Sequence, residues 1–126
     1  MRYLLDTTLI VDHAHGYQAA VQLLQRLYEQ GGELLTCDVV VCEALSGGSD
    51  EHVEVVSRLL GPLDYVATDP TAARQAGEAR KRRHRAGGKL RVGDALIAAV
   101  ADGLGATIVT RHRPDFERQG ASVLTY

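Results

Sequence analysis

The sequence predicts a single α/β domain, a three-layer α/β/α sandwich around a central parallel sheet. Short apolar segments typical of buried strands alternate along the chain with longer segments whose apolar residues recur at helical spacing. This alternation requires crossover connections, which make the strands parallel and place helices on both faces of the sheet. With 126 residues and no repeat or linker, the chain from residue 1 to 126 fits one domain with one core.

The expected elements of residues 1–67 follow that pattern. In order they are a strand at Tyr3–Leu5, a helix beginning at Leu9, a helix from Tyr17 to Tyr28, a strand at Glu33–Thr36, helices at Val39–Leu45 and Asp50–Leu60, and a strand at Leu63–Ala67. The apolar stripe of the second helix is expected in the core, and any excess width would serve dimerisation. The β-branched run Val39-Val40-Val41 leaves both helix and strand open for its segment.

The rest of the chain continues the alternation. Asp69 followed by Pro70 indicates a helix start, because aspartate caps a first turn and proline fits its first position. In order, the expected elements are that helix, ending by Gly87-Gly88, a helix opened by Gly93-Asp94 and ended by Gly103 and Gly105, a strand at Ala106–Thr110, a short helix at Arg113–Arg118 and a strand at Ser122–Thr125.

The composition excludes several classes of protein. With 45% hydrophobic and 24% charged residues, the chain is not wholly disordered. No apolar run approaches the roughly 20 residues of a membrane span, and Asp6 interrupts the stretch in which a secretory signal would continue. We therefore expect a cytoplasmic protein without a membrane partner. Cys37 and Cys42 match neither a redox pair nor a zinc site, and we expect both in the core.

The net charge of −2 conceals an uneven distribution. Residues 1–79 carry 12 acidic and 4 basic residues, a net −8, whereas residues 80–126 carry 4 acidic and 10 basic residues, a net +6. Half of the basic residues lie in residues 80–91: Arg80, Lys81, Arg82, Arg83, Arg85, Lys89 and Arg91. Such a segment, with Arg111 and Arg113 expected near the same edge, indicates a polyanionic partner; contact with a partner protein or a merely solvated helix end are the alternatives.

Acidic residues lie where the expected strands end, at the edge where open α/β sheets bind ligands. Asp6 ends the first strand, and Asp94 opens the helix that leads into the fourth. Asp115 follows the fourth strand closely. Glu43 comes from the helix after the second strand, which normally neighbours the first in a parallel sheet. We therefore expect these four carboxylates to converge.

Carboxylates at close range repel one another, so a cluster of four needs protonation or a cation. Oxygen ligands of this kind select Mg²⁺ or Mn²⁺. Either ion binds phosphate oxygens and lowers the pKa of a water molecule, which is the chemistry of phosphodiester hydrolysis. The sequence therefore predicts a metal-dependent nuclease site, with the basic segment holding the polyanion against it.

Four blocks of the sequence resemble those of PIN-domain proteins and occur in the same order. They are residues 4–8 (Leu-Leu-Asp-Thr-Thr), 43–45 (Glu-Ala-Leu), 91–99 (Arg-Val-Gly-Asp-Ala-Leu-Ile-Ala-Ala) and 109–116 (Val-Thr-Arg-His-Arg-Pro-Asp-Phe). The resemblance spans nearly the whole chain, and the chain has the size of stand-alone toxins of the VapC type. It implies a PIN-like fold and a metal-dependent endoribonuclease, the toxin of a toxin–antitoxin pair that inhibits translation or growth.

The resemblance also implies roles for residues. The main acidic site residues and metal ligands would be Asp6, Glu43 and Asp94, with Asp115 as the fourth, although Asp12 stays open as its alternative. Small hydroxyl residues around the metal-bound water would be Thr7 or Thr8 and Thr110, and His112 stands where many relatives have Asn or Asp. The expected RNA contacts are Arg82, Arg83, Arg85, Lys89, Arg91 and Arg111. Expected partners are an RNA substrate cut to 5′-phosphate and 3′-hydroxyl ends, a second copy in a homodimer, and a VapB-type antitoxin whose tail enters the site.

Each of these acids also has a purely structural alternative. Asp6 and Asp94 could stabilise helix starts without catalysis, Glu43 could pair with an arginine, and Asp115 could be a surface residue. Four other aspartates are expected as caps or solvated side chains: Asp12, Asp38, Asp69 and Asp102. His13 and His15 are two positions apart and do not share a helix face, so we expect them exposed rather than binding zinc.

Other functions begin with similar features. A haloacid-dehalogenase-like phosphatase needs a second aspartate two residues after the first, where Thr8 stands. A receiver domain needs a lysine beyond its fifth strand, and residues 106–126 contain none. The remaining alternative is a catalytically inactive PIN-like module that binds RNA or protein, which would keep its RNA affinity in the presence of a chelator.

Overall fold

The computed structural model describes residues 1–126 and contains every element expected from the sequence. These are β1 (Arg2–Leu5), α1 (Thr7–Ala14), α2 (Gln18–Glu29), β2 (Glu33–Cys37), α3 (Asp38–Leu45), α4 (Asp50–Leu60), β3 (Asp64–Val66), α5 (Pro70–Arg85), α6 (Val92–Leu104), β4 (Thr107–Val109), α7 (Arg113–Glu117) and β5 (Val123–Leu124). The segment that the sequence left open between helix and strand is the helix α3.

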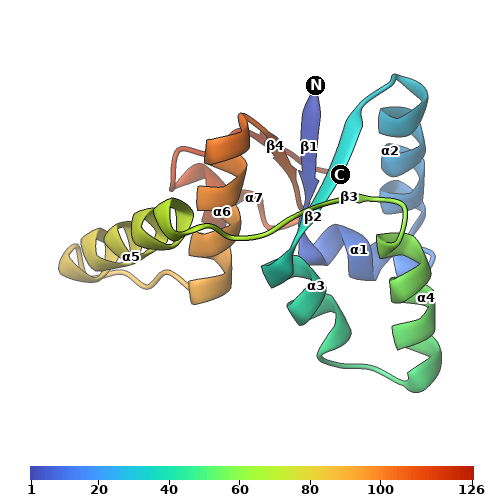
Figure 1. The fold of residues 1–126 in the computed structure, drawn as a ribbon, viewed down its shortest axis with the longest axis horizontal. Coiled ribbons are helices and arrows are strands. Elements are labelled where there is room, and N and C mark those ends of the chain that lie inside the picture. Colours follow the sequence, from blue (N-terminus) through green and yellow to red (C-terminus); the bar gives the residue numbers. More distant parts are fainter.

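The strands form one five-stranded sheet in the order β3-β2-β1-β4-β5, and every pair is parallel. Leu4 of β1 stands in register with Leu35 of β2 on one side and Ile108 of β4 on the other. Figure 1 shows α1, α2 and α4 on one side of the sheet and α5 and α6 on the other. The predicted three-layer α/β/α sandwich is therefore confirmed.

The carboxyl ends of the strands meet at one edge of the sheet. β1 runs away from the N-terminus and leads directly into α1, and β2 leads into α3 at the same edge (Figure 1). The first turn of α6 also lies at this edge (Figure 1). Residues that follow strands or begin helices at this edge are thereby brought together, as the sequence predicts.

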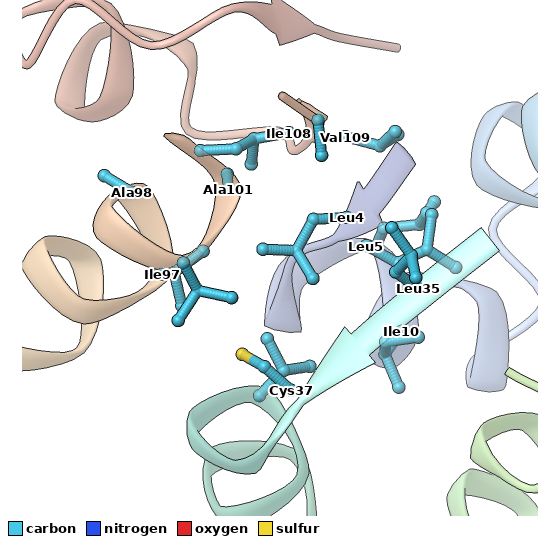
Figure 2. Close-up of a cluster of buried hydrophobic side chains, with 14 of the residues drawn as sticks. Leu4, Leu5, Ile10, Leu35, Cys37, Ile97, Ala98, Ala101, Ile108 and Val109 are labelled. Atoms are coloured by element: carbon cyan, nitrogen blue, oxygen red, sulfur yellow. The ribbon is translucent and has the colours of Figure 1, made fainter. Parts of the chain in front are cut away.

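The core lies between the sheet and both helical layers. Leu4 and Leu5 are completely buried although they point to opposite faces of β1, because a central parallel strand is covered on both sides. Ile97 of α6 and Ile108 of β4 fill one layer, and Ile10 of α1 fills the other (Figure 2). This packing fixes the starts of α1 and α6 relative to β1.

Helix α5 forms an arm that packs mainly against α6. Its start is fixed as predicted, because the Asp69 carboxylate accepts a hydrogen bond of 2.7 Å from the main-chain N–H of Ala72. Near its end, Arg80 Nε donates to the Leu90 carbonyl oxygen at 3.0 Å. The far end of α5 stands away from the sheet (Figure 1).

Some burial predictions were wrong. Tyr17 and Tyr28, expected in the core, have exposed fractions of 51% and 74%. They lie at the two ends of the apolar stripe of α2, whose buried middle part already packs against the rest of the fold. Cys37 is buried as expected, whereas Cys42 is exposed since it lies on the outer face of α3. No helix combines the length and apolar character that a membrane span requires.

Candidate active site

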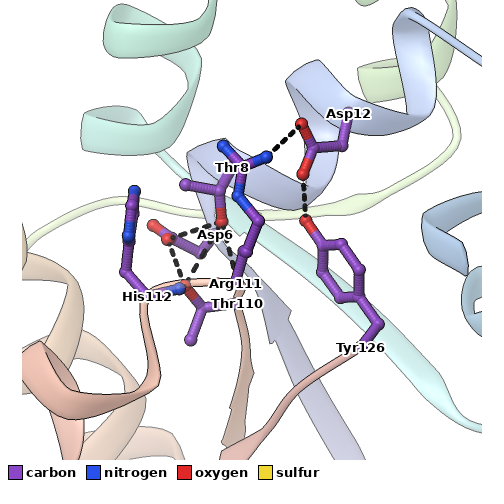
Figure 3. Close-up of polar contacts among 7 residues, drawn as sticks. All are labelled: Asp6, Thr8, Asp12, Thr110, Arg111, His112 and Tyr126. Atoms are coloured by element: carbon purple, nitrogen blue, oxygen red, sulfur yellow. Dashed lines mark hydrogen bonds and ion pairs between the residues drawn. The ribbon is translucent and has the colours of Figure 1, made fainter. Parts of the chain in front are cut away.

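Asp6 is the most deeply buried acid of the predicted cluster, with an exposed fraction of 4%. It stands at the N-cap position of α1, yet its side chain makes no capping hydrogen bond. Instead its Oδ2 accepts hydrogen bonds from Thr110 Oγ1 at 2.7 Å and from Thr8 Oγ1 at 3.2 Å (Figure 3). The structural alternative for Asp6, a helix cap, is therefore wrong.

The two hydroxyl groups that hold Asp6 are themselves fixed by the chain. Thr8 and Thr110 Oγ1 lie 3.3 Å apart, and they accept the main-chain N–H groups of Arg111 at 3.1 Å and of His112 at 3.0 Å, respectively. Burial raises the pKa of Asp6, and the hydrogen bonds from the threonines partly offset that rise. The structure thus aims one carboxylate toward the sheet edge and holds it there.

Glu43 approaches the start of α6 from α3. Its Oε1 accepts a hydrogen bond of 2.7 Å from Thr7 Oγ1. Its Oε2 lies so close to Gly93 that a Cβ atom built there would be 2.5 Å away. No arginine or lysine pairs with Glu43, which removes the arginine alternative. Because Gly93 precedes Asp94, this contact brings two predicted site acids side by side.

Asp94 lies in the first turn of α6, half-buried and without a hydrogen bond or ion pair from its side chain. Burial, followed by the negative charges of the other three predicted acids, raises the pKa of Asp94 to about 6, and Arg91 only partly opposes this. Those three acids are Asp6, Asp115 and Glu43. The charges of all four predicted carboxylates therefore meet at Asp94.

Asp115 is an exposed residue of α7. The side-chain amide of Gln119 donates to the main-chain oxygen of Asp115 at 3.1 Å and to that of Asp94 at 3.4 Å. This amide ties the main chain of α7 to the start of α6, and the charge of Asp115 acts on Asp94, but the Asp115 side chain itself is exposed, as its structural alternative expected.

Asp12 does not belong to this group of acids. It was expected as a cap or solvated side chain, or as the acid that completes the site, but it is buried, with an exposed fraction of 8%. Tyr126 donates a hydrogen bond of 2.7 Å to Asp12 Oδ2, and Arg111 forms an ion pair of 3.4 Å with Oδ1 (Figure 3). Asp12 is absent from the charges that act on Asp94. Its own charge is already neutralised by Arg111.

Asp102, Asp38, His13 and His15 lie outside the cluster. Asp102 is solvated as expected and accepts a hydrogen bond from Gln75 at 3.0 Å. Asp38 was expected to cap or to be solvated, but it is half-buried and holds Thr68 of the β3–α5 connection. His15 is exposed, whereas His13 is half-buried, and burial lowers its pKa. No zinc-binding group forms around them.

The donor set of the cluster fits a hard divalent cation. All four side chains offer carboxylate oxygens, and none has a basic ion-pair partner; burial first, and then the repulsion from the other three, raises the pKa of Asp94. No three acidic, histidine or cysteine side chains converge closely enough to coordinate an ion directly. Mg²⁺ is usually bound through one or two carboxylates and retains several waters, so this wider arrangement suits it.

The basic residues expected to contact RNA lie in different places in the fold. Arg82 and Arg83 line a cavity of about 770 Å³ between α5, α6 and the α7–β5 connection, which contains none of the four carboxylates. Lys89 and Arg91 line a second, of about 490 Å³, at the α5–α6 turn. Arg85 is exposed on the arm. Arg111 alone of the six is joined to the residues that hold Asp6.

Sequence reasoning missed three residues that shape the site. Tyr126 and Gln119 act through hydrogen bonds to residues far away in the sequence, and no local sequence pattern predicts such bonds. Gly93 could have been singled out, because a glycine inside the first turn of a helix is unfavourable unless something needs the space of its missing side chain. Here that space is filled by Glu43.

Comparison with known sequences identifies one family over this whole region. The profile of the PIN domain matches residues 3–120. Ribonuclease VapC19 of Mycobacterium tuberculosis is 30% identical over 116 residues, which cover 90% of this chain and 93% of the relative. VapC ribonuclease Mb1587 of Mycobacterium bovis is 34% identical over 113 residues, which cover 86% and 84% of the two chains.

Solved structures share the fold. A chain of the VapBC2 complex from Rickettsia felis, bound to a DNA fragment from its promoter, superposes with a TM-score of 0.85. The superposition covers 100% of this chain and 99% of that one at 20% sequence identity. The arrangement of the sheet and the helices around it is thus one already seen in an experimentally determined structure.

Proposed function

The chain belongs to the PIN-domain family, and from that membership we propose that it is a metal-dependent endoribonuclease of the VapC type, the toxin of a toxin–antitoxin pair that inhibits translation or growth. One observation carries the proposal: the charges of Asp6, Glu43 and Asp115 act together on Asp94, with no basic side chain paired to any of the four. Above pH 6, where Asp94 is ionised, a structural role alone would leave that repulsion unrelieved. The relatives that share a third of its residues are named ribonucleases.

The residues proposed to hold the ion, one or two directly and the others through its water molecules, are Asp6, Glu43, Asp94 and Asp115. Mg²⁺ or Mn²⁺ bound there would supply a Lewis acid for the scissile phosphate and a water of lowered pKa. Thr8 and Thr110 keep the Asp6 carboxylate pointed at the edge of the sheet, and Thr7 does the same for Glu43. These residues therefore orient the ligands before the substrate arrives.

The proposed substrate is RNA, cut to 5′-phosphate and 3′-hydroxyl ends. The acidic cluster would repel a polyanion by itself, so binding requires cations around it. Residues 80–91, which include the N-cap residue of α6, and Arg111, which follows the threonine that holds Asp6, are the proposed source of these cations. Exposed arginines contact phosphates regardless of the base sequence, so they would bind the RNA backbone without selecting its sequence.

The proposed partners are a second copy of the chain in a homodimer and a VapB-type antitoxin in the cytoplasm. The likeness to a toxin–antitoxin complex over the full length of this chain supports them. An antitoxin tail that carries a positive charge would fit the uncompensated carboxylates directly, and would block the cluster by taking the place of the cation.

The decisive experiment incubates the purified protein and its Asp94→Asn variant with end-labelled total cellular RNA in Mg²⁺ or Mn²⁺, with and without EDTA. We expect discrete cuts only for the wild type and only with metal, and sequencing of the ends names the substrate. A matched control is Asp64→Asn, which removes an exposed carboxylate outside the cluster and should cut as the wild type does.

The alternative function, an inactive RNA-binding module, predicts another pattern. Both the wild type and Asp94→Asn would bind RNA equally well in EDTA, and neither would cut it with any divalent metal. That result would overturn the nuclease proposal.

A further inference from the structure

Arg111 differs from the other basic residues near the acidic cluster because its guanidinium is held in place. It forms an ion pair with Asp12 Oδ1 at 3.4 Å, and the Tyr126 hydroxyl secures the other carboxylate oxygen at 2.7 Å (Figure 3). Asp12 is nearly buried, with 12% of its side chain exposed, whereas 53% of the Arg111 side chain is exposed. Asp12 therefore holds Arg111 from within the protein, while about half of the Arg111 side chain stays exposed.

The main chain of Arg111 is joined to the proposed metal ligands as well. Its N–H donates to Thr8 Oγ1 at 3.1 Å, and the same hydroxyl donates to Asp6 Oδ2 at 3.2 Å. The residue before it, Thr110, donates to that oxygen at 2.7 Å. The position of the guanidinium is thus set relative to Asp6 both through the backbone and through Asp12 of α1.

No other basic residue has both a held guanidinium and a hydrogen bond to a residue that holds Asp6, although Arg80 donates to the Leu90 carbonyl oxygen at 3.0 Å. Arg82, Arg85 and Lys89 are exposed and form no ion pair, and Arg113 is paired with Glu117 of its own short helix. An unpaired arginine loses side-chain entropy when a ligand orders it. Arg111 has already lost much of that freedom, so it binds a phosphate at lower entropic cost.

We propose that Arg111 binds a substrate phosphate beside the scissile bond, and that Asp12 and Tyr126 are positioning residues that fix its guanidinium for that contact. This inference rests on the proposed nuclease function. Arginine suits the task, because its planar fork donates two parallel hydrogen bonds to a phosphate. Asp12 and Tyr126 do not touch the substrate and act only through Arg111.

The first test measures RNA binding without catalysis. A fluorescein-labelled single-stranded RNA of mixed sequence is titrated in EDTA, and its anisotropy gives Kd for the wild type, Arg111→Gln and Arg111→Lys. We expect Kd to rise about tenfold for Arg111→Gln, the loss of one charge-assisted contact, and less for Arg111→Lys, which keeps the charge but not the fork. Circular dichroism and Tm establish that each variant is folded.

The second test shows whether Asp12 acts through Arg111. A double-mutant cycle compares KM of Asp12→Asn, Arg111→Gln and the double variant, on an RNA carrying the mapped cut site. We expect Asp12→Asn to raise KM about threefold with kcat unchanged, and to add nothing once Arg111 is replaced. Tyr126→Phe should raise KM in the same direction. Asp64→Asn changes the net charge by the same amount as Asp12→Asn but at a position away from Arg111, and it should leave KM unchanged.

The outcomes separate the two proposals. If the wild type cuts RNA but Arg111→Gln leaves both Kd and KM unchanged, the phosphate contact is wrong. If Asp12→Asn raises KM by the same factor with and without Arg111, Asp12 is not a positioning residue for it. If the wild type cuts no RNA, the nuclease proposal fails, and the anisotropy titration still decides whether Arg111 binds phosphate.

Discussion

Gly93 is the residue on which the spacing of the acidic cluster depends most directly. A Cβ atom at this position would lie 2.5 Å from Glu43 Oε2, so Gly93→Ala must displace the carboxylate. Alanine favours a helix over glycine by about 1 kcal/mol, and we expect the variant to remain folded. Its rate of metal-dependent RNA cleavage should fall about tenfold or more, because one proposed ligand moves.

The same helix offers a matched control. Gly103 of α6 has no atom within 4 Å of a Cβ built there, so Gly103→Ala should keep full activity and gain about 0.5–1 kcal/mol in free energy of unfolding by urea. Equal activity loss in both variants would show that the helix, and not the contact with Glu43, causes the effect.

Asp94 allows the repulsion within the cluster to be measured as stability. Its folded-state pKa of about 6 lies above the ordinary value of 3.8, so the folded protein favours the neutral acid. The contribution of Asp94 to the free energy of unfolding is therefore most favourable below pH 3.8, and it is lost as the pH rises through 6. At pH 7.5 without metal, Asp94→Asn should be more stable than the wild type by about 1 kcal/mol after solvent screening, and the difference should vanish near pH 4.

Divalent metal should favour the wild type over Asp94→Asn in thermal stability. Because a bound cation relieves the repulsion, Mg²⁺ or Mn²⁺ should raise the Tm of the wild type by more than that of Asp94→Asn, as differential scanning fluorimetry can measure. Equal Tm shifts in the two proteins would contradict a role for Asp94 in holding the ion.

Sequence reasoning located single residues well where local chemistry fixes them. Asp69 caps α5 as expected, because the Asp-Pro pair is a local signal. Asp12 was misjudged, because its partners Arg111 and Tyr126 lie about a hundred residues away in the sequence. A buried carboxylate can be recognised only when the long-range fold that supplies its partners is known.

At the scale of elements, one contact joins α3 to the connection between β3 and α5. Asp38, the first residue of α3, accepts hydrogen bonds from the Thr68 hydroxyl at 2.7 Å and from the Thr68 N–H at 3.2 Å. Although burial opposes ionisation, the hydrogen bonds from Thr68 and Val39 prevail and lower the pKa of Asp38. The contact therefore depends on an ionised carboxylate.

This contact gives a prediction for the pH dependence of stability. The contribution of Asp38 is fully present above pH 3.8 and is lost as the pH falls through its lowered folded-state pKa. Asp38→Asn should cost about 1 kcal/mol at pH 7, measured by urea unfolding, and progressively less below pH 4. The control Asp64→Asn, an exposed acid on the neighbouring β3, should be neutral at both pH values.

The elements themselves were largely predictable. Apolar spacing and glycine or proline boundaries identified each helix and strand, since these signals are local. The run Val39-Val40-Val41 stayed open because β-branched residues favour strands, whereas in the fold α3 buries Val40 against the core and leaves Cys42 outside. Tertiary packing, which the local sequence does not carry, decided that case.

At the scale of the whole molecule, the uneven charge separates an acidic part from a basic arm. If the exposed arginines of α5 contact RNA, Arg82→Gln/Arg85→Gln should flatten the plot of log K against log salt concentration by about 1.4, or about 0.7 for each lost phosphate contact. Arg26→Gln/Arg58→Gln removes the same charge from α2 and α4 and should leave the slope unchanged. Anisotropy titrations at several salt concentrations provide the measurement, and equal slopes for both double variants would exclude the arm from the interface.

The attachment of α5 has a consequence for how such proteins diversify. The arm meets the rest of the protein mainly along α6, and its far end, with the turn at Gly87-Gly88, stands clear of the sheet (Figure 1). Insertions or exchanges there leave β1, α3 and the first turn of α6 undisturbed. Because Ala72, Ala76 and Leu90 belong to the buried core, we expect the exposed turn between them, and not the whole arm, to accept a graft from a relative that redirects the proposed nuclease to another RNA while its acidic edge stays the same.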